Sequence, residues 1–315
     1  MQNISLYDLD LNYITETHFT TSMQWHLRYN ASNDGNIFEF HIDKDNAFAV
    51  EVMANRNKEL LLIQGDKIGY IDTISDIDGS FAIFGYTIEW LISTRTTAPL
   101  NFASKTPQFV INSLVTTVFP ELEYVNLTTT NIPVFNYAKV DREITSSIVV
   151  DICSKYNLGW KIQINWTTNK FMFILYEGKS RIAGTTEPLI ISKQDKTIDE
   201  YTYTQERRDY RSEGWYKLAG VWTKYTKTAE TGLHIRDCIL TDTETEKAKE
   251  SLAKQKMNET IKGTIAEFLL FGVDYGLGDL ITFQLSQGTK DLRITGVNEV
   301  YEYNNTFVEP VFEGE

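Results

Sequence analysis

Histidine and cysteine side chains are the first groups to consider for chemistry, and their distribution argues against a catalytic or metal centre. The four histidines are scattered over strand-like sequence, at His18, His26, His41 and His234. The two cysteines, Cys153 and Cys238, lie far apart and lack the CxxC spacing of a zinc site. No GxSxG, HExxH, GxxxxGK[ST] or GxGxxG sequence is present. We therefore expect no catalytic residues, no bound metal and no cofactor.

Carboxylates are the remaining groups that could do chemistry. The segment Asp76-Ile-Asp78-Gly79 resembles the opening of a calcium loop, but Thr87 stands where that loop would place its last ligand, a glutamate. A turn is the favoured interpretation. With 43 acidic residues, two carboxylates at the separation of a glycoside hydrolase stay an open alternative that only the folded structure decides. A sugar-binding platform of exposed Trp and Tyr side chains is another alternative, although a β core accounts for such residues more simply.

Net charge and hydropathy narrow the classes of partner. The 315 residues carry a formal net charge of −13, which disfavours a nucleic-acid-binding surface because phosphate contacts need concentrated Lys and Arg. No apolar run approaches the roughly 18 residues of a membrane span, and the N-terminus lacks the basic start and apolar core of a signal peptide. We expect a chain without an export signal or membrane anchor, assembled in a reducing cytoplasm.

The elements that must position these side chains are mainly strands. Seventeen Tyr, seventeen Phe and six Trp, with only six Pro, favour sheet over helix. From Ile4 to about Arg95, short alternating segments are separated by turn residues, as in Ser22–Tyr29 and Ile37–Ile42 on either side of Asn33–Asn36. Several short strands with close turns predict a barrel or a sandwich.

The segment Ile265–Leu285 is the expected anchor of a second β-rich region. Two apolar runs flank Asp274-Tyr-Gly-Leu-Gly-Asp279, in which Gly276 and Gly278 can take the positive φ of a tight reversal. The residues after Asp279 alternate as a strand on a core requires. We predict a hairpin across this turn.

Helical patterns lie between the two β-rich regions. The spacing of Ile88, Leu91 and Ile92 predicts a short helix. Thr106-Pro107 is typical of an N-cap followed by the first helical residue, and it predicts a helix that ends before Pro120.

A third helix and a hairpin complete this middle part. Residues Asp141–Tyr156 form the clearest helical pattern, with Asp141 as the expected cap and an apolar residue at every fourth position. Trp160–Trp166 and Phe171–Tyr176 flank a polar turn and predict a hairpin.

The resulting fold class is mainly β with an α+β insert. We predict a first β-rich domain over residues 1–100, an α+β insert over 101–185 and a second β-rich domain over 186–315. Thr243 and Glu246 have capping-box spacing and predict a largely exposed helix over about 243–260. The similar order of strands, turn and helix at both ends suggests a duplicated barrel.

Three stretches together resemble the siphophage tail hub proteins of the ReqiPepy type. Gly85-Tyr-Thr-Ile-Glu-Trp-Leu-Ile-Ser-Thr-Arg95 is similar to their "G-Y-S-L-E-x-L-L-x-x-R" signature. Asp274-Tyr-Gly-Leu-Gly-Asp-Leu-Ile-Thr282 is similar to their "D-Y-x-L-G-D-I-V-T" segment, and Phe307–Glu315 is similar to their C-terminal "P-x-F-G-E". The positions that match the signatures, and to which the resemblance assigns a structural role, are Gly85, Tyr86, Glu89, Leu91, Arg95, Asp274, Tyr275, Gly278 and Asp279.

The resemblance implies a structural hub protein rather than an enzyme. Such a hub is a homotrimer in which two tube-like β-barrel domains per chain give a pseudo-sixfold ring in the tail tip or baseplate of the virion. The ring adapts a hexameric tail tube to a threefold tip and forms part of the DNA channel. The implied partners are the distal tail or tail tube protein, a tip spike, fibre or lysin protein, and the tape measure protein. Under this hypothesis, an acidic lumen would repel DNA phosphates and let DNA slide.

Overall fold

The computed structural model describes most of the chain. The described residues are 3–18, 21–30, 36–192, 201–206, 210–218, 221–240, 257, 260–265, 275–285, 288–302 and 305–314. Strands predominate over helices, so the prediction of a mainly β fold with an α+β insert is confirmed.

The N-terminal part forms an antiparallel sheet that carries one helix. Its strands are β1 (Ile4–Asp8), β2 (Tyr13–Thr17), β3 (Ser22–Arg28), β4 (Ile37–Asp43), β5 (Leu60–Gln64), β6 (Lys67–Ile77) and β7 (Ser80–Thr87), in the order β3-β4-β7-β6-β5-β1-β2. The expected pairing of β3 with β4 is confirmed. Helix α1 (Ala47–Ala54) was not predicted; Asn46 caps it, and Phe48 and Val52 pack with Trp25 in the core under this sheet.

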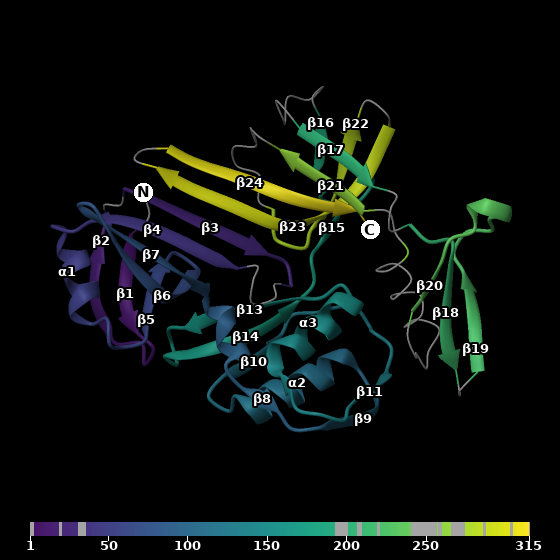
Figure 1. Cartoon of the computed structure of the whole chain (residues 1–315), viewed down its shortest axis with the longest axis horizontal. Helices are drawn as coiled ribbons and strands as arrows, with labels where there is room; N and C mark the ends of the chain where they lie inside the picture. The colour runs from purple at the N-terminus through teal and green to yellow at the C-terminus, as the bar shows by residue number, and fades with distance from the viewer. Residues whose placement is uncertain are drawn as a thin grey trace.

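The C-terminal strands continue the same sheet, as Figure 1 shows. Strand β23 (Gly288–Glu302) pairs with β3 on one side and with β24 (Asn305–Gly314) on the other, and β21 (Thr260–Ile265) and β17 (Tyr201–Glu206) follow. The outer strands of this path, β17 and β2, do not pair with each other, and no sheet closes into a barrel within the described residues. Backbone hydrogen bonds therefore join the N-terminal strands directly to the C-terminal strands.

Of the hairpin predicted over 265–285, residues 266–274 lie outside the described residues, but the described strands β15 (Ser180–Arg181), β16 (Ile190–Ser192) and β23 occupy both edges of its second arm. Strand β22 (Leu280–Leu285) reverses onto β23 instead, and its other edge pairs in parallel with β15 and β16. Among the described strands, β21 pairs with β17 and β24 and not with β22. The turn at Gly278 directs the chain toward residues 178–181, because Asp279 hydrogen-bonds the backbone there.

The α+β insert packs two helices against a small sheet. Its elements are the 3-10 helix η1 (Ile88–Ser93), β8 (Thr96–Thr97), β9 (Leu100–Lys105), α2 (Pro107–Val118), β10 (Glu123–Asn126), β11 (Phe135–Lys139), β12 (Glu143–Ile144), α3 (Thr145–Lys155), β13 (Gly159–Asn165) and β14 (Lys170–Tyr176). The central sheet has the order β10-β14-β13, and its apolar side chains share one core with α2, α3 and η1. In Figure 1 this part lies below the long sheet.

Most of the predicted elements of the insert are present. Thr106 accepts a hydrogen bond from Phe109 N at 3.2 Å and caps α2, as predicted, and the β13–β14 hairpin is confirmed. Helix α3 begins later than predicted, at Thr145, because Glu143 and Ile144 pair with β8; Asp141 is therefore not its cap. The short helix predicted near residues 88–92 forms with 3-10 geometry.

A small three-stranded sheet stands apart from the main body in Figure 1. It contains β18 (Glu213–Leu218), β19 (Val221–Thr226) and β20 (Asp237–Ile239), with the 3-10 helix η2 (Gly232–His234) before the last strand. Of the helix predicted over 243–260, residues 243–256, 258 and 259 lie outside the described residues, and Thr260 begins strand β21 instead. No helix in the described ranges has the length and apolarity that a membrane crossing requires.

Candidate functional site

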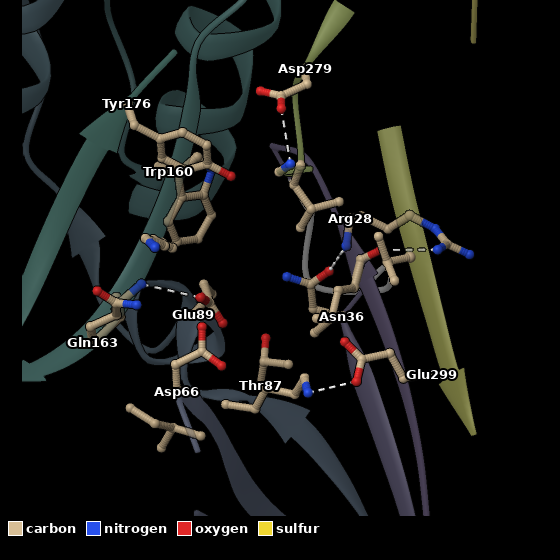
Figure 2. Close-up of a pocket in the computed structure, with 18 of the residues that line it drawn as sticks. Arg28, Asn36, Asp66, Thr87, Glu89, Trp160, Gln163, Tyr176, Asp279 and Glu299 are labelled. Carbon is tan, nitrogen blue, oxygen red and sulfur yellow. Dashed lines mark hydrogen bonds and ion pairs between the residues drawn. The ribbon is translucent and has the colours of Figure 1, made fainter. Parts of the chain in front are cut away.

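A cavity of about 510 Å³ lies where the N-terminal sheet, the insert and the C-terminal strands meet (Figure 2). Figure 2 draws Trp160 and Tyr176 on one side of it and Arg28 and Asn36 on the other. The charged residues that line it are Arg28, Asp66, Lys67, Glu89, Lys161, Glu177, Lys179, Asp279 and Glu299. Each part of the fold therefore contributes charge to one shared space.

The structure brings together only some of the signature residues. Glu89, Tyr275 and Asp279 line the cavity, although Glu89 is separated from the other two by more than 180 residues of sequence. Gly278 lies beside them in the turn before β22. Asp274 lies outside the described residues.

The remaining signature residues hold elements in place around η1 rather than lining the cavity. Tyr86 stacks on Trp90, with ring centroids 6.0 Å apart, and Leu91 packs against the core of the insert. Arg95 caps the C-terminus of α2 by donating to Val118 O at 2.8 Å, and it forms an ion pair with Glu121 at 3.0 Å. Gly85 lies in the centre of the sheet, where Cβ of any other residue would be 1.9 Å from Tyr70 O.

Glu89 is the most unusual ionisable group of the cavity. It sits at the start of η1, partly buried, and its Oε1 accepts a hydrogen bond from Ile162 N of β13 at 3.1 Å. Burial raises the pKa of the Glu89 carboxyl, and the neighbouring Thr87 side chain and the Ile162 amide oppose this rise only in part. Among the described residues it has no ion-pair partner.

Asp279, by contrast, is fully engaged. The residue is 5% exposed; Oδ1 accepts from Lys179 N at 2.8 Å and Oδ2 from Gly276 N at 3.0 Å. Arg181 Nη1 lies 3.9 Å from Oδ2. The Asp279 carboxylate thus stabilises the turn that precedes it and binds the backbone next to β15, the strand that pairs with β22.

Two residues that the sequence analysis missed tie the three parts of the fold together. Tyr29 donates its hydroxyl to Asn157 O at 2.9 Å, and its ring lies against Gly278 and Gly159, where a Cβ would approach to 2.3 and 2.2 Å. Burial raises the pKa of Tyr29 to about 12. Asn30, with φ of 54°, accepts from the Trp160 indole at 3.2 Å and donates to Val150 O of α3 at 3.3 Å.

Most other charged groups around the cavity have partners. Lys67 pairs with Glu299 at 2.6 Å, and Arg28 donates to Asn298 Oδ1 at 3.0 Å. Burial alone would raise the pKa of the Glu177 carboxyl, but hydrogen bonds from Thr129 and Thr130, including those from their backbone amides at 2.7 and 3.1 Å, lower it below the ordinary value. The described residues contain no group of three or more His, Cys, Asp or Glu side chains that could hold a metal ion. The cavity therefore combines ion pairs with carboxylates, among them Glu89 and Asp66, for which no ion pair is found among the described residues.

We expect Glu89→Gln to raise the melting temperature near pH 7.5 and to have a smaller effect near pH 4. The raised pKa means that the folded state holds the Glu89 proton more tightly than the unfolded chain. Stability is therefore lost as the pH rises from the ordinary value of 4.5 through the folded-state pKa. Glutamine keeps an oxygen for Ile162 N but does not ionise. Thermal unfolding at both pH values measures the effect, with the exposed Glu302→Gln as control; an equal loss of stability at both pH values would contradict it.

Comparison with solved structures finds the same architecture in three tail proteins. The tail protein from Neisseria meningitidis MC58 matches with a TM-score of 0.69 and 12% identity, over 100% of this chain and 97% of that one. Prophage tail protein gp18 from Listeria monocytogenes EGD-e matches with a TM-score of 0.66 and 13% identity, over 100% and 95%. The 43 kDa tail protein of prophage MuSo2 from Shewanella oneidensis matches with a TM-score of 0.61 and 10% identity, over 99% and 96%.

The sequence itself gives no such match. No family model matches the chain, and no curated protein matches it significantly. At identities of 10–13% the similarity concerns the fold and carries no residue roles. This chain has the fold of phage tail proteins.

Proposed function

We propose that this protein is a structural hub of a phage or phage-like tail, of the ReqiPepy type, and that it acts as a homotrimer in the tail tip or baseplate. The observation that carries the proposal is the agreement in fold over whole chains: three tail proteins are each covered to at least 95% by this chain. The similarity includes the insert as well as the β-rich parts, so the shared unit is the complete arrangement.

The sheet supports a ring built from three copies. The pairing of β23 with β3 makes the N-terminal and C-terminal strands one continuous layer. In the described part of the chain, this layer ends in the edge strands β2 and β17, whose outer backbone groups have no partner strand. Edge strands of this kind are covered in stable assemblies. Three copies placed edge to edge would present six β-rich parts to a hexameric tail tube.

The expected partners are neighbouring tail components. The upper face of the ring would contact the distal tail or tail tube protein, the lower face a tip spike, fibre or lysin protein, and the channel the tape measure protein. The formal net charge of −13 suits a lumen through which DNA passes without binding. In an assembled ring, a lumen lined mainly by Lys and Arg would contradict this part of the proposal.

Sedimentation equilibrium tests the oligomeric state directly. We expect a mass of three chains at micromolar concentration, or a shift from one to three chains when the neighbouring tail proteins are added. A chain that stays monomeric in both conditions would contradict the trimeric hub.

A glycoside hydrolase of the tail tip is the alternative that the cavity makes testable. The pKa of Glu89 is raised, as in a general acid. Asp66 also lines the cavity, has no described partner, and could act as the second carboxylate of a hydrolase. A zymogram with bacterial cell wall, comparing the wild-type chain with Glu89→Gln, separates the two functions. The hub proposal expects no clearing by either protein; clearing that the substitution abolishes would favour the hydrolase. Binding to a glycan array would favour the carbohydrate-binding alternative instead.

A further inference from the structure

Ionisation of the Glu89 side chain is unfavourable in the folded protein. The hydrogen bond that Glu89 accepts from Ile162 N, at 3.1 Å, could be accepted equally well by a neutral glutamine. The ionised form is penalised by burial, and no described cation lies within ion-pair distance. A partly buried carboxylate without an ion-pair partner, at the wall of a cavity, is typical of a binding site.

A second polar group lies beside Glu89 at the cavity wall. Thr87 is 4% exposed and lines the same cavity, and its hydroxyl interacts with the Glu89 carboxyl. The Thr87 oxygen accepts no hydrogen bond from the described residues. Figure 2 shows Thr87 and Glu89 together at the same end of the cavity. Their oxygens can both accept hydrogen bonds from one guest.

The wall next to these acceptors is aromatic. Tyr176 and Trp160 line the cavity, and the Trp160 indole N–H is already donated to Asn30. Lys161 Nζ lies 5.7 Å from the centroid of the Tyr176 ring, so this wall already attracts one cation. The charge of Lys161 acts on Glu89 without forming an ion pair. Acceptors, negative charge and an aromatic face together select a hydrogen-bond donor with positive charge.

We propose that this cavity binds an organic cation, a guanidinium or primary ammonium group, with Glu89 as the counter-ion and Thr87 as a second acceptor. A volume of about 510 Å³ lies in the range of ligand sites and is larger than the cationic group alone, so it can admit an arginine or lysine side chain with its backbone. A guest held here would contact η1, β7 and β13 at once and would lock the N-terminal sheet to the insert. This site does not depend on the trimeric state of the chain.

An NMR titration of the isotope-labelled chain with N-acetyl-arginine amide tests the site, followed at the Ile162 amide and the Trp160 indole. We expect saturable shifts at these two signals, and binding weaker by about tenfold or more for N-acetyl-citrulline amide, which has nearly the same shape but no charge. Glu89→Gln should weaken binding of the arginine probe by a similar factor. Equal binding of both probes, or unchanged binding to the Glu89→Gln protein, would overturn the proposal.

Lys161→Ala is the matched control, since it removes the basic residue that competes for the Tyr176 ring. We expect binding that is unchanged or tighter; weaker binding would show that Glu89 is not the counter-ion of the guest and would overturn the proposal.

The peptide Gly-Gly-Arg-Gly-Gly distinguishes the source of the cation. If it binds as tightly as the arginine amide, the guest is a side chain of another polypeptide; if only the amide binds, the guest is a small molecule. Binding of neither would overturn the site itself.

Discussion

Replacing Gly85 with alanine is expected to lower the free energy of unfolding by about 3 kcal/mol, at the upper end of the usual cost of overpacking. A Cβ at this position would lie 1.9 Å from Tyr70 O and 2.6 Å from the Phe38 ring. The carbonyl belongs to the neighbouring strand β6, and Phe38 is 1% exposed, so neither can withdraw without breaking the pairing of β7 with β4 and β6. Denaturant unfolding followed by circular dichroism measures the change.

Gly276→Ala is the matched control for this substitution. Its Cβ would meet only the Asp279 side chain, at an ordinary contact distance of 3.7 Å. We expect a change of less than about 1 kcal/mol, because alanine fits this position and a loss of chain entropy in the unfolded state offsets small strain. If the two substitutions lowered the free energy of unfolding equally, the close approach of β6 would not be the reason that position 85 needs glycine.

Asp279→Ala is expected to lower the free energy of unfolding by about 2–4 kcal/mol, because it leaves the amides of Lys179 and Gly276 without their charged acceptor. We expect Asp279→Asn to lose much of the same stability. An amide side chain has one oxygen, whereas the two backbone donors bind different oxygens of the carboxylate. Chemical denaturation of both variants measures these losses.

Asp141→Ala is the control, since Asp141 is exposed and does not cap α3. Its effect should stay within about 0.5 kcal/mol. If Asp279→Asn were as stable as the wild type, the account of Asp279 as a dual acceptor that ties β15 to the turn before β22 would be wrong.

Local patterns in the sequence were sufficient for most individual elements. The cap at Thr106, with proline next to it, predicted α2 correctly because both signals act within one turn of helix. The β3–β4 and β13–β14 pairings followed from alternation on both sides of a short polar turn. Helix α1 escaped prediction because Ala47–Ala54 is apolar on most sides, which hides the helical period.

Pairings between distant segments could not be predicted in this way. The pairing of β23 with β3 joins residues about 270 positions apart. The parallel pairing of β16 with β22 joins two strands between which the chain also forms the small three-stranded sheet of β18, β19 and β20. The hairpin predicted over 265–285 failed for this reason. The turn at Gly276 and Gly278 was recognised, but the partner of the following strand is set by Asp279 and β15 rather than by the turn.

The candidate site was predictable only in part. The resemblance to hub proteins drew attention to Glu89, Tyr275 and Asp279, and these three residues line one cavity. Nothing in the sequence around Thr87 or Trp160 indicates that their side chains line the same cavity as Glu89, because this depends on how the insert is placed against the N-terminal sheet. Asparagine tolerates the left-handed backbone region, and Asn30 stands between a strand pattern and a turn-rich segment. This gave a weak indication of a left-handed residue, and its φ is 54°.

Single-particle cryo-microscopy of the chain assembled with its adjacent tail proteins tests the central claim, that three copies of this fold form a hub between tube and tip. The proposal predicts a threefold ring around an open channel, with the two β-rich parts of each chain alternating to give six similar units against the tube. A chain found as a single copy, or one whose edge strands β2 and β17 face solvent with no ring around a channel, would contradict the proposal.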